Sequence, residues 1–197
     1  MEHAAAWLGE PRFTDGLLDS PVLNLPSHAR EGWIEMVTTW HLYDWVSVGE
    51  QETVAEHWLS TPSPKLREVE DLVRRAAAHP LSFYQVVVKE PGRGMVLVDL
   101  LTGDEHYVFD RKLSVSLPER SITLGRLLPL QGLTILDAVG PRAFPPERAA
   151  GVHREVTELI GPEPWSHATL RSASTDMLDL YVRMTNEDDA RALRPRL

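Results

Sequence analysis

Residues 81–110 read LSFYQVVVKEPGRGMVLVDLLTGDEHYVFD, and the change of pattern that decides the fold lies at their start. Before Leu81, apolar residues recur every three or four positions, as they do in helices. From Leu81 onward they alternate with a period of two, as they do in strands. Two turns that contain glycine, PGRG at 91–94 and TGD at 102–104, divide the stretch into three short strands. We therefore expect a run of β-hairpins to begin here.

The PGRG turn raises a second possibility, a glycine-rich loop that binds phosphate. Such a loop follows a strand and opens a helix, so that the N-terminal amides of the helix point at the anion. Here residues 95–101 alternate with a period of two, and the sequence contains no Gly-Lys-Ser/Thr. A strand therefore follows the turn, and we interpret PGRG as a hairpin tip with Arg93 in solvent.

Strand character continues beyond this stretch. Five segments are rich in Val, Ile, Leu, Phe and Tyr and are bounded by Gly, Pro or acidic turns: 83–89, 95–101, 105–111, 122–130 and 133–139. Five short strands joined mostly by tight turns predict a small closed barrel of SH3-like or OB-like type, because an open sheet would leave unprotected edges.

Helical patterns flank the barrel on both sides. On the N-terminal side, residues 31–45 have helical spacing, and Thr53 with Glu56 forms a capping box. The next helix is expected to start at Ser63-Pro64 and to end before Pro80. Its predicted apolar face consists of Leu66, Val69, Leu72, Val73 and Ala76.

On the C-terminal side, one helix is expected to end at Gly161-Pro162 and a last long helix to begin at Ser166. Residues 186–197 are expected to fray or to form a short terminal helix. The predicted fold class is α+β. It has an N-terminal helical region at 1–80, a small β-barrel at 81–145, and a C-terminal helical region at 146–197 that packs on the rest.

Composition excludes several classes of function. The chain of 197 residues contains no cysteine, so disulfides, thiol catalysis and thiolate metal sites are excluded. A net charge of −9 argues against a general nucleic-acid-binding protein, because phosphate contacts require clustered Lys and Arg. No stretch approaches the ~20 apolar residues of a membrane helix. The N-terminus lacks the pattern of a signal peptide, so we expect a cytoplasmic protein with no membrane partner.

Several stretches together resemble a known family. They are residues 81–105, LGRLLPL at 124–130, AFPP at 143–146 and WHLYDW at 40–45. This set is similar to a pattern in uncharacterised bacterial proteins often associated with a SEC-C motif, and the resemblance covers roughly residues 31–160. It implies the fold and no particular reaction. The zinc-binding SEC-C tail of that family uses cysteines, so its metal site does not carry over to this chain.

Two sets of residues are candidates for a site. His41 and Asp44 lie three apart on one predicted helix and His57 on the next, so they could bind a divalent metal in a hydrolase. The alternative is that they hydrogen-bond within an aromatic core that includes Trp40 and Trp45.

The second set lies in the barrel. Four basic residues could gather on one barrel face beside Tyr84 or Tyr107 and bind a single-stranded nucleic acid: Arg111, Lys112, Arg120 and Arg126. The alternative is that they are scattered surface charges.

These observations favour a non-enzymatic scaffold or adaptor protein that needs no cofactor and binds another protein or a second copy of itself. The metal-dependent hydrolase and the nucleic-acid-binding barrel stand as alternatives. Five of the six tryptophans precede residue 60, and two interpretations of them stand: they form either a buried core or a partner-binding surface.

Overall fold

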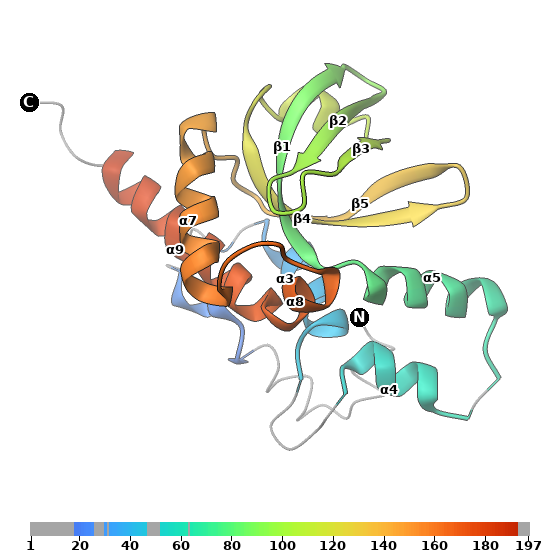
Figure 1. The fold of residues 1–197 in the computed structure, drawn as a ribbon. Helices are drawn as coiled ribbons and strands as arrows, with labels where there is room; N and C mark the ends of the chain where they lie inside the picture. Colours follow the sequence, from blue (N-terminus) through green and yellow to red (C-terminus); the bar gives the residue numbers. More distant parts are fainter. Residues whose placement is uncertain (1–17, 26–29, 31, 47–51, 63, 193–197) are drawn as a thin grey trace, which may run out of the picture.

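In the computed structural model, residues 18–25, 30, 32–46, 52–62 and 64–192 are described. The chain forms a β-barrel with helices packed along one side of it (Figure 1). Its strands are β1 (Leu81–Glu90), β2 (Gly94–Asp99), β3 (Glu105–Val108), β4 (Ile122–Leu130) and β5 (Leu133–Val139). The predicted α+β fold with a central five-stranded barrel is confirmed.

The barrel closes in the order β1-β2-β3-β5-β4, with β4 returning to β1. All neighbouring strands are antiparallel except β3 and β5, which are parallel and meet at Val108 and Thr134. A short helix, α6 (Leu113–Ser116), lies between β3 and β4. This strand order with one parallel pair is that of an OB-like barrel.

Both glycine-containing turns are hairpin turns, as the sequence predicts. PGRG joins β1 to β2, and Gly92 has φ +78° there, a conformation that favours glycine. The second turn is organised by Asp99, which is buried. Its Oδ1 accepts hydrogen bonds from the Ser82 hydroxyl (2.7 Å) and from the backbone N–H of Leu101 (2.8 Å). The DLLTG sequence is thus explained by the structure of this turn.

The N-terminal helical elements are η1 (Pro21–Asn24), α3 (Ile34–Tyr43), α4 (Val54–Ser60) and α5 (Arg67–Ala78). The capping box at Thr53 is confirmed, since Thr53 accepts from the N–H of Glu56 and the Glu56 carboxylate accepts from the N–H of Thr53. The expected start at Ser63-Pro64 is wrong. Helix α5 begins at Arg67, after an extended Leu66, and Ser63 lies outside the described residues.

The C-terminal elements are η3 (Pro146–Arg148), α7 (Ala149–Ile160), α8 (His167–Ser172) and α9 (Ser174–Ala192). Ser166 caps α8 through the N–H of Thr169, as expected. The single long helix predicted after it is in fact two, because Ala173 is not helical and separates α8 from α9. Helix α9 continues through the charged segment to Ala192, so the change predicted at residue 186 does not occur, and residues 193–197 lie outside the described residues.

Alternation along the strands divides the buried side chains into two cores. Inside the barrel lie residues such as Val86, Met95 and Leu97. The outer face of β1 and β4 forms a second core with α3, α7 and α9, and it includes Phe83 and Leu124. Strand β4 is therefore covered on both faces, one by the barrel interior and the other by helices.

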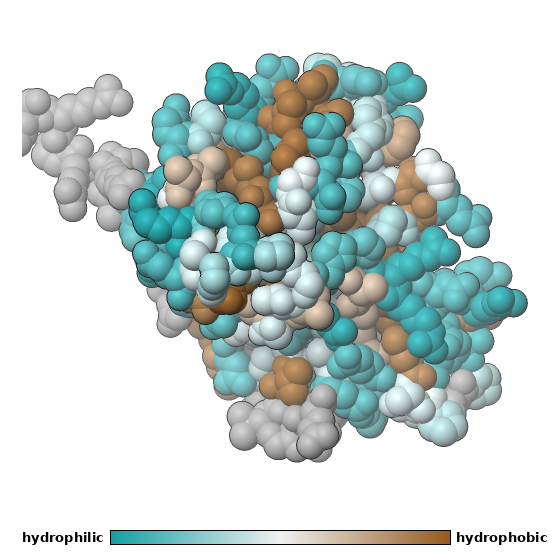
Figure 2. Space-filling model, viewed as in Figure 1, coloured by the Kyte–Doolittle hydropathy of each residue, from teal (hydrophilic) through white to brown (hydrophobic). Residues whose placement is uncertain are grey.

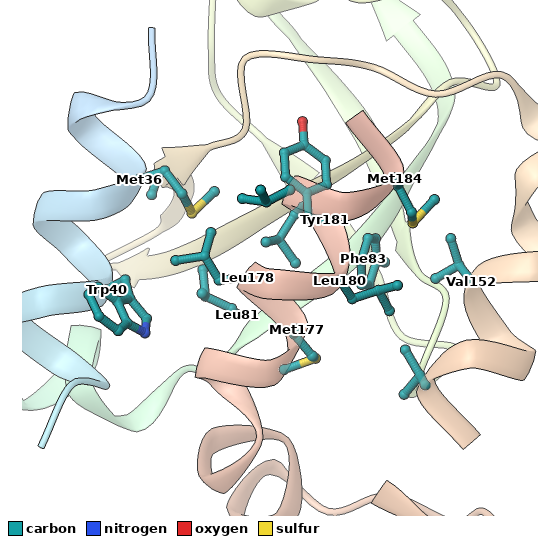
Figure 3. Close-up of a cluster of buried hydrophobic side chains, with 14 of the residues drawn as sticks. Met36, Trp40, Leu81, Phe83, Val152, Met177, Leu178, Leu180, Tyr181 and Met184 are labelled. Carbon is teal, nitrogen blue, oxygen red and sulfur yellow. The ribbon is translucent and has the colours of Figure 1, made fainter. Parts of the chain in front are cut away.

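Tyr181 of α9 lies at the centre of the second core (Figure 3). Its ring meets those of Trp33 and Phe144 edge-on, with centroids 5.3 and 5.1 Å away. Its hydroxyl donates to the carbonyl of Arg142 and accepts from the N–H of Arg142 (3.0 Å). Burial raises the pKa of this hydroxyl, so it stays protonated and able to donate.

Most tryptophans among the described residues are buried in the core. Four of them are at most 7% exposed: Trp33, Trp40, Trp45 and Trp165. Trp58 is half-buried, and Trp7 lies outside the described residues. Of the two readings of the tryptophan content, the buried one therefore holds for these four residues. No helix in the described ranges is both long enough and apolar enough to cross a membrane.

We expect Gly140→Ala to destabilise the protein, because a Cβ at this position would collide with the ring and hydroxyl of Tyr181. Overpacking of this kind costs about 1–3 kcal/mol. Urea denaturation followed by circular dichroism measures the loss. Gly151→Ala is the matched control, because its Cβ meets no atom within 4 Å in helix α7 and should be neutral or stabilising. Equal stabilities for the two variants would contradict the prediction.

Candidate functional site

The most unusual charged group of the molecule is Arg126, which the alternation of β4 places on the strand's helix-facing side together with Ile122 and Leu124. Its side chain has no solvent exposure. The expectation that Arg126 joins exposed basic residues on a nucleic-acid-binding face is therefore wrong. The sequence carries a signal for this, since Arg126 continues the period-two row of Ile122 and Leu124.

Arg126 binds the C-terminal ends of two helices. One guanidinium nitrogen, Nη1, donates to the carbonyls of Ala76 (3.2 Å) and His79, at the end of α5. The other, Nη2, donates to the carboxylate of Asp44, the residue that ends α3. The last carbonyls of a helix lack partners within the helix and carry partial negative charge. The buried guanidinium supplies these carbonyls with both hydrogen-bond donors and a positive charge.

The surroundings of this arginine shift the pKa values of its neighbours. Burial raises the pKa of Asp44 to about 6, although the charge of Arg126 opposes the shift. Burial also raises the pKa of Asp137 on β5, again opposed by Arg126. The ring of Tyr43 lies against the cation, with 5.2 Å between the guanidinium carbon and the ring centroid. These residues form the buried charge cluster: Tyr43, Asp44, Arg126 and Asp137.

The three metal-ligand candidates occupy different environments. His41 is buried with its ring against Trp45, at a centroid distance of 4.9 Å, and burial lowers its pKa. Asp44 pairs with Arg126. His57 lies in an exposed position, where its Nδ1 is 2.6 Å from the Glu52 carboxylate. Within the described ranges, no group of three or more His, Cys, Asp or Glu side chains could hold a metal ion.

Asp44 also lines an open depression of about 340 Å³ between α3, α4 and α8. Glu56 and Arg171 also line it and form an ion pair with each other, with 2.6 Å between the carboxylate and the guanidinium. Both carboxylates of this depression therefore have an arginine partner, Asp44 inside the protein and Glu56 at the surface. The arrangement joins the N-terminal helices to α8 and suits a structural role.

A second candidate lies on the opposite, uncovered side of the barrel. Strand register places Val88 of β1 beside Val96 of β2, and Val96 beside Tyr107 of β3. Phe109 follows at the end of β3, and its ring meets Tyr107 edge-on with centroids 4.9 Å apart. We call this row the barrel-face strip: Val88, Val96, Tyr107 and Phe109. Figure 2 shows brown, hydrophobic groups over β1 and β2 among teal ones.

Basic residues flank one end of the barrel-face strip. Arg93 at the PGRG tip, Phe109 and Arg111 line an open depression of about 480 Å³ with Gly92. Phe109 is 41% exposed there. Glu90 lies close by, 3.3 Å from Arg93, and accepts a hydrogen bond from the Tyr107 hydroxyl (3.0 Å).

The remaining predicted basic residues, Lys112 and Arg120, are exposed as Arg111 is. Only Arg111 of the predicted set lines the depression. Sequence reasoning missed Val88 and Phe109, because their position beside Tyr107 depends on the pairing register of three strands.

Comparisons of the chain with protein-family models, with curated proteins and with solved structures found no match. The resemblance to SEC-C-associated proteins therefore stays a prediction.

We expect Arg126→Met to destabilise the protein by about 3–5 kcal/mol, because it leaves the Asp44 carboxylate buried without its counter-charge. The free energy of unfolding in urea measures the loss. The double variant Arg126→Met/Asp44→Asn removes both charges and should lose less than the single variant. Arg111→Met, in an exposed position, is the control and should stay within about 0.5 kcal/mol of wild type. A similar loss for Arg111→Met and Arg126→Met would contradict this role.

The raised pKa of Asp44 predicts a pH dependence with a definite sign. Its ordinary value of 3.8 applies to the unfolded chain and about 6 to the folded one, so the folded state binds the proton more tightly. The contribution of Asp44 to stability therefore decreases as pH rises from about 4 to about 6, by about 1.4 kcal/mol for each unit of difference. The test compares unfolding free energies of wild type and Asp44→Asn over this range. A difference that does not change with pH would contradict the assignment.

Proposed function

We propose that the protein is a non-enzymatic adaptor that uses the barrel-face strip and its flanking arginines to bind an acidic segment of a partner protein. The observation that carries the proposal is the depression lined by Arg93, Phe109 and Arg111, which brings an exposed aromatic ring and two cations to one site. Aromatic residues and arginine are the groups most enriched at protein interfaces and their hot spots.

The shape and charge of this surface support a peptide ligand. Val88 is 51% exposed and extends the apolar surface from Phe109 across the strands. The two arginines carry the positive charge that an acidic segment would meet. The buried charge cluster, by contrast, holds helix ends and has no side-chain exposure at Arg126 and Asp44, so it is not offered to an outside ligand.

A single-stranded nucleic acid is the second candidate, and one observation favours it. Tyr107 and Phe109 lie beside Arg93 and Arg111 on an OB-like barrel, and bases stack on aromatic rings while arginines contact phosphates. The net charge of −9 and the carboxylate of Glu90 within this surface disfavour it, because a nucleic acid carries a phosphate charge at every nucleotide, whereas a short peptide need place acidic groups only at Arg93 and Arg111. The protein partner is therefore the first choice.

We expect the double variant Arg93→Ala/Arg111→Ala to lose the partner in affinity co-purification from the native host with quantitative mass spectrometry. Loss of hot-spot arginines weakens binding by tenfold or more, at about 1.4 kcal/mol for each factor of ten. Arg154→Ala, an exposed arginine on α7, is the matched control and should keep the partner.

A parallel titration separates the two candidates. Fluorescence anisotropy with a labelled oligo-dT at low and at physiological salt should show no binding if the ligand is a protein. Binding that weakens steeply with salt and is lost in the double variant would favour the nucleic acid instead. Co-purifying proteins that are all retained by the double variant would overturn the adaptor proposal.

A further inference from the structure

Helix α5 presents an apolar stripe that no other element of the described part of the chain covers. The sequence predicts a core-facing row along this helix, yet the structure buries only its last member, Ala76, together with Ala77. Leu66 is 71% exposed, Val69 42% and Leu72 41%. A helix of twelve residues with such a row normally packs it against another element. The first turns of α5 therefore present an unused packing surface.

The anchoring of α5 explains why this surface projects. The helix is held at its C-terminal end, where Ala76 and Ala77 are buried and Arg126 binds the carbonyls of Ala76 and His79. From that end the helix extends outward below the β4–β5 hairpin in the view of Figure 1, and it contacts both α4 and β4. The exposed apolar residues lie toward the free, N-terminal end.

One acidic and one basic residue beside the stripe are spaced so that each could pair with its opposite charge on a second, antiparallel copy of the helix. Glu68 and Arg75 are seven residues apart, so they lie on the same flank of the helix, two turns from each other. Neither forms an ion pair with another residue in the described ranges. On the other flank, Glu70 already pairs with Arg74 within the helix, at 2.6 Å. The flank beside Leu72 thus carries one acidic and one basic group, each available to a partner.

We propose that α5 docks antiparallel against α5 of a second copy of this chain, with the two-fold axis near Leu72. In this arrangement Leu72 meets its symmetry mate, and Val69 and Leu66 extend the apolar contact on either side. Glu68 of each copy then lies opposite Arg75 of the other, so the edge that carries this flank gains two ion pairs. In a parallel arrangement the flank with Glu68 and Arg75 would instead face the opposite flank of the other copy, where Glu70 and Arg74 already pair with each other.

The contact is one helix wide, so the dimer is expected to be weak and to depend on protein concentration. It uses neither the barrel-face strip nor the buried charge cluster. The proposal is therefore independent of the adaptor function, and a failure of one leaves the other unaffected.

Sedimentation velocity of the full chain over a wide concentration range tests the dimer. Wild type should shift from monomer to dimer as concentration rises, and Leu72→Glu should stay monomeric at every concentration. Leu159→Glu is the matched control, because Leu159 is 43% exposed on α7 and the same change there should leave dimerisation unaltered. A monomeric wild type, or a Leu72→Glu variant that still dimerises, would overturn the proposal.

Charge reversal tests the antiparallel geometry without changing the apolar stripe. Glu68→Arg alone places arginine against arginine, and Arg75→Glu alone places glutamate against glutamate, so each should dimerise roughly three- to tenfold more weakly. An equimolar mixture of the two single variants restores both opposite-charge pairs and should form heterodimers with near wild-type affinity. A mixture that dimerises no better than the separate variants would overturn the antiparallel arrangement.

Discussion

The ion pair between Arg126 and Asp44 connects three parts of the molecule that are far apart in the sequence. The guanidinium comes from a barrel strand, the carboxylate from the end of α3, and the two carbonyls from the end of α5. Neither charge has any exposure to solvent. Removing two charges from water is costly, and here their mutual attraction and the hydrogen bonds of the guanidinium to Asp44 and to two helix-end carbonyls offset part of that cost. This contact therefore links both α3 and α5 to the barrel, and α3 is held in addition by its packing in the second core.

The same arrangement decides which barrel surfaces remain free. Helices α3, α7 and α9 cover the outer face of β1 and β4, where Phe83 and Leu124 form one core with Tyr181. The outer face of β2, β3 and the far end of β1 stays uncovered, and it carries Tyr107 and Phe109. A barrel that used all of its outer surface for helix packing would have no such face. The asymmetry of the helical cover thus produces the candidate binding surface.

Local signals in the sequence predicted most of the fold. The strands could be placed within a few residues, because the period-two pattern and the glycine turns act over short distances. The capping box at Thr53 is equally local. Errors occurred where the outcome depends on distant contacts. The start of α5 and the continuation of α9 past Asn186 are of this kind, as is the exposure of Leu66 and Val69.

The sequence by itself determined the order of elements, the closed barrel and the hairpin identity of PGRG, because alternation and turn chemistry are properties of neighbouring residues. The tertiary structure decided which basic residues of the barrel are buried. Arg126 continues the row of Ile122 and Leu124, but only the packing of helices on that row makes it buried between helix ends, whereas Arg111 is exposed beside Phe109. The physical reason is that burial depends on what packs against a strand, and the helices that cover β4 come from both ends of the chain.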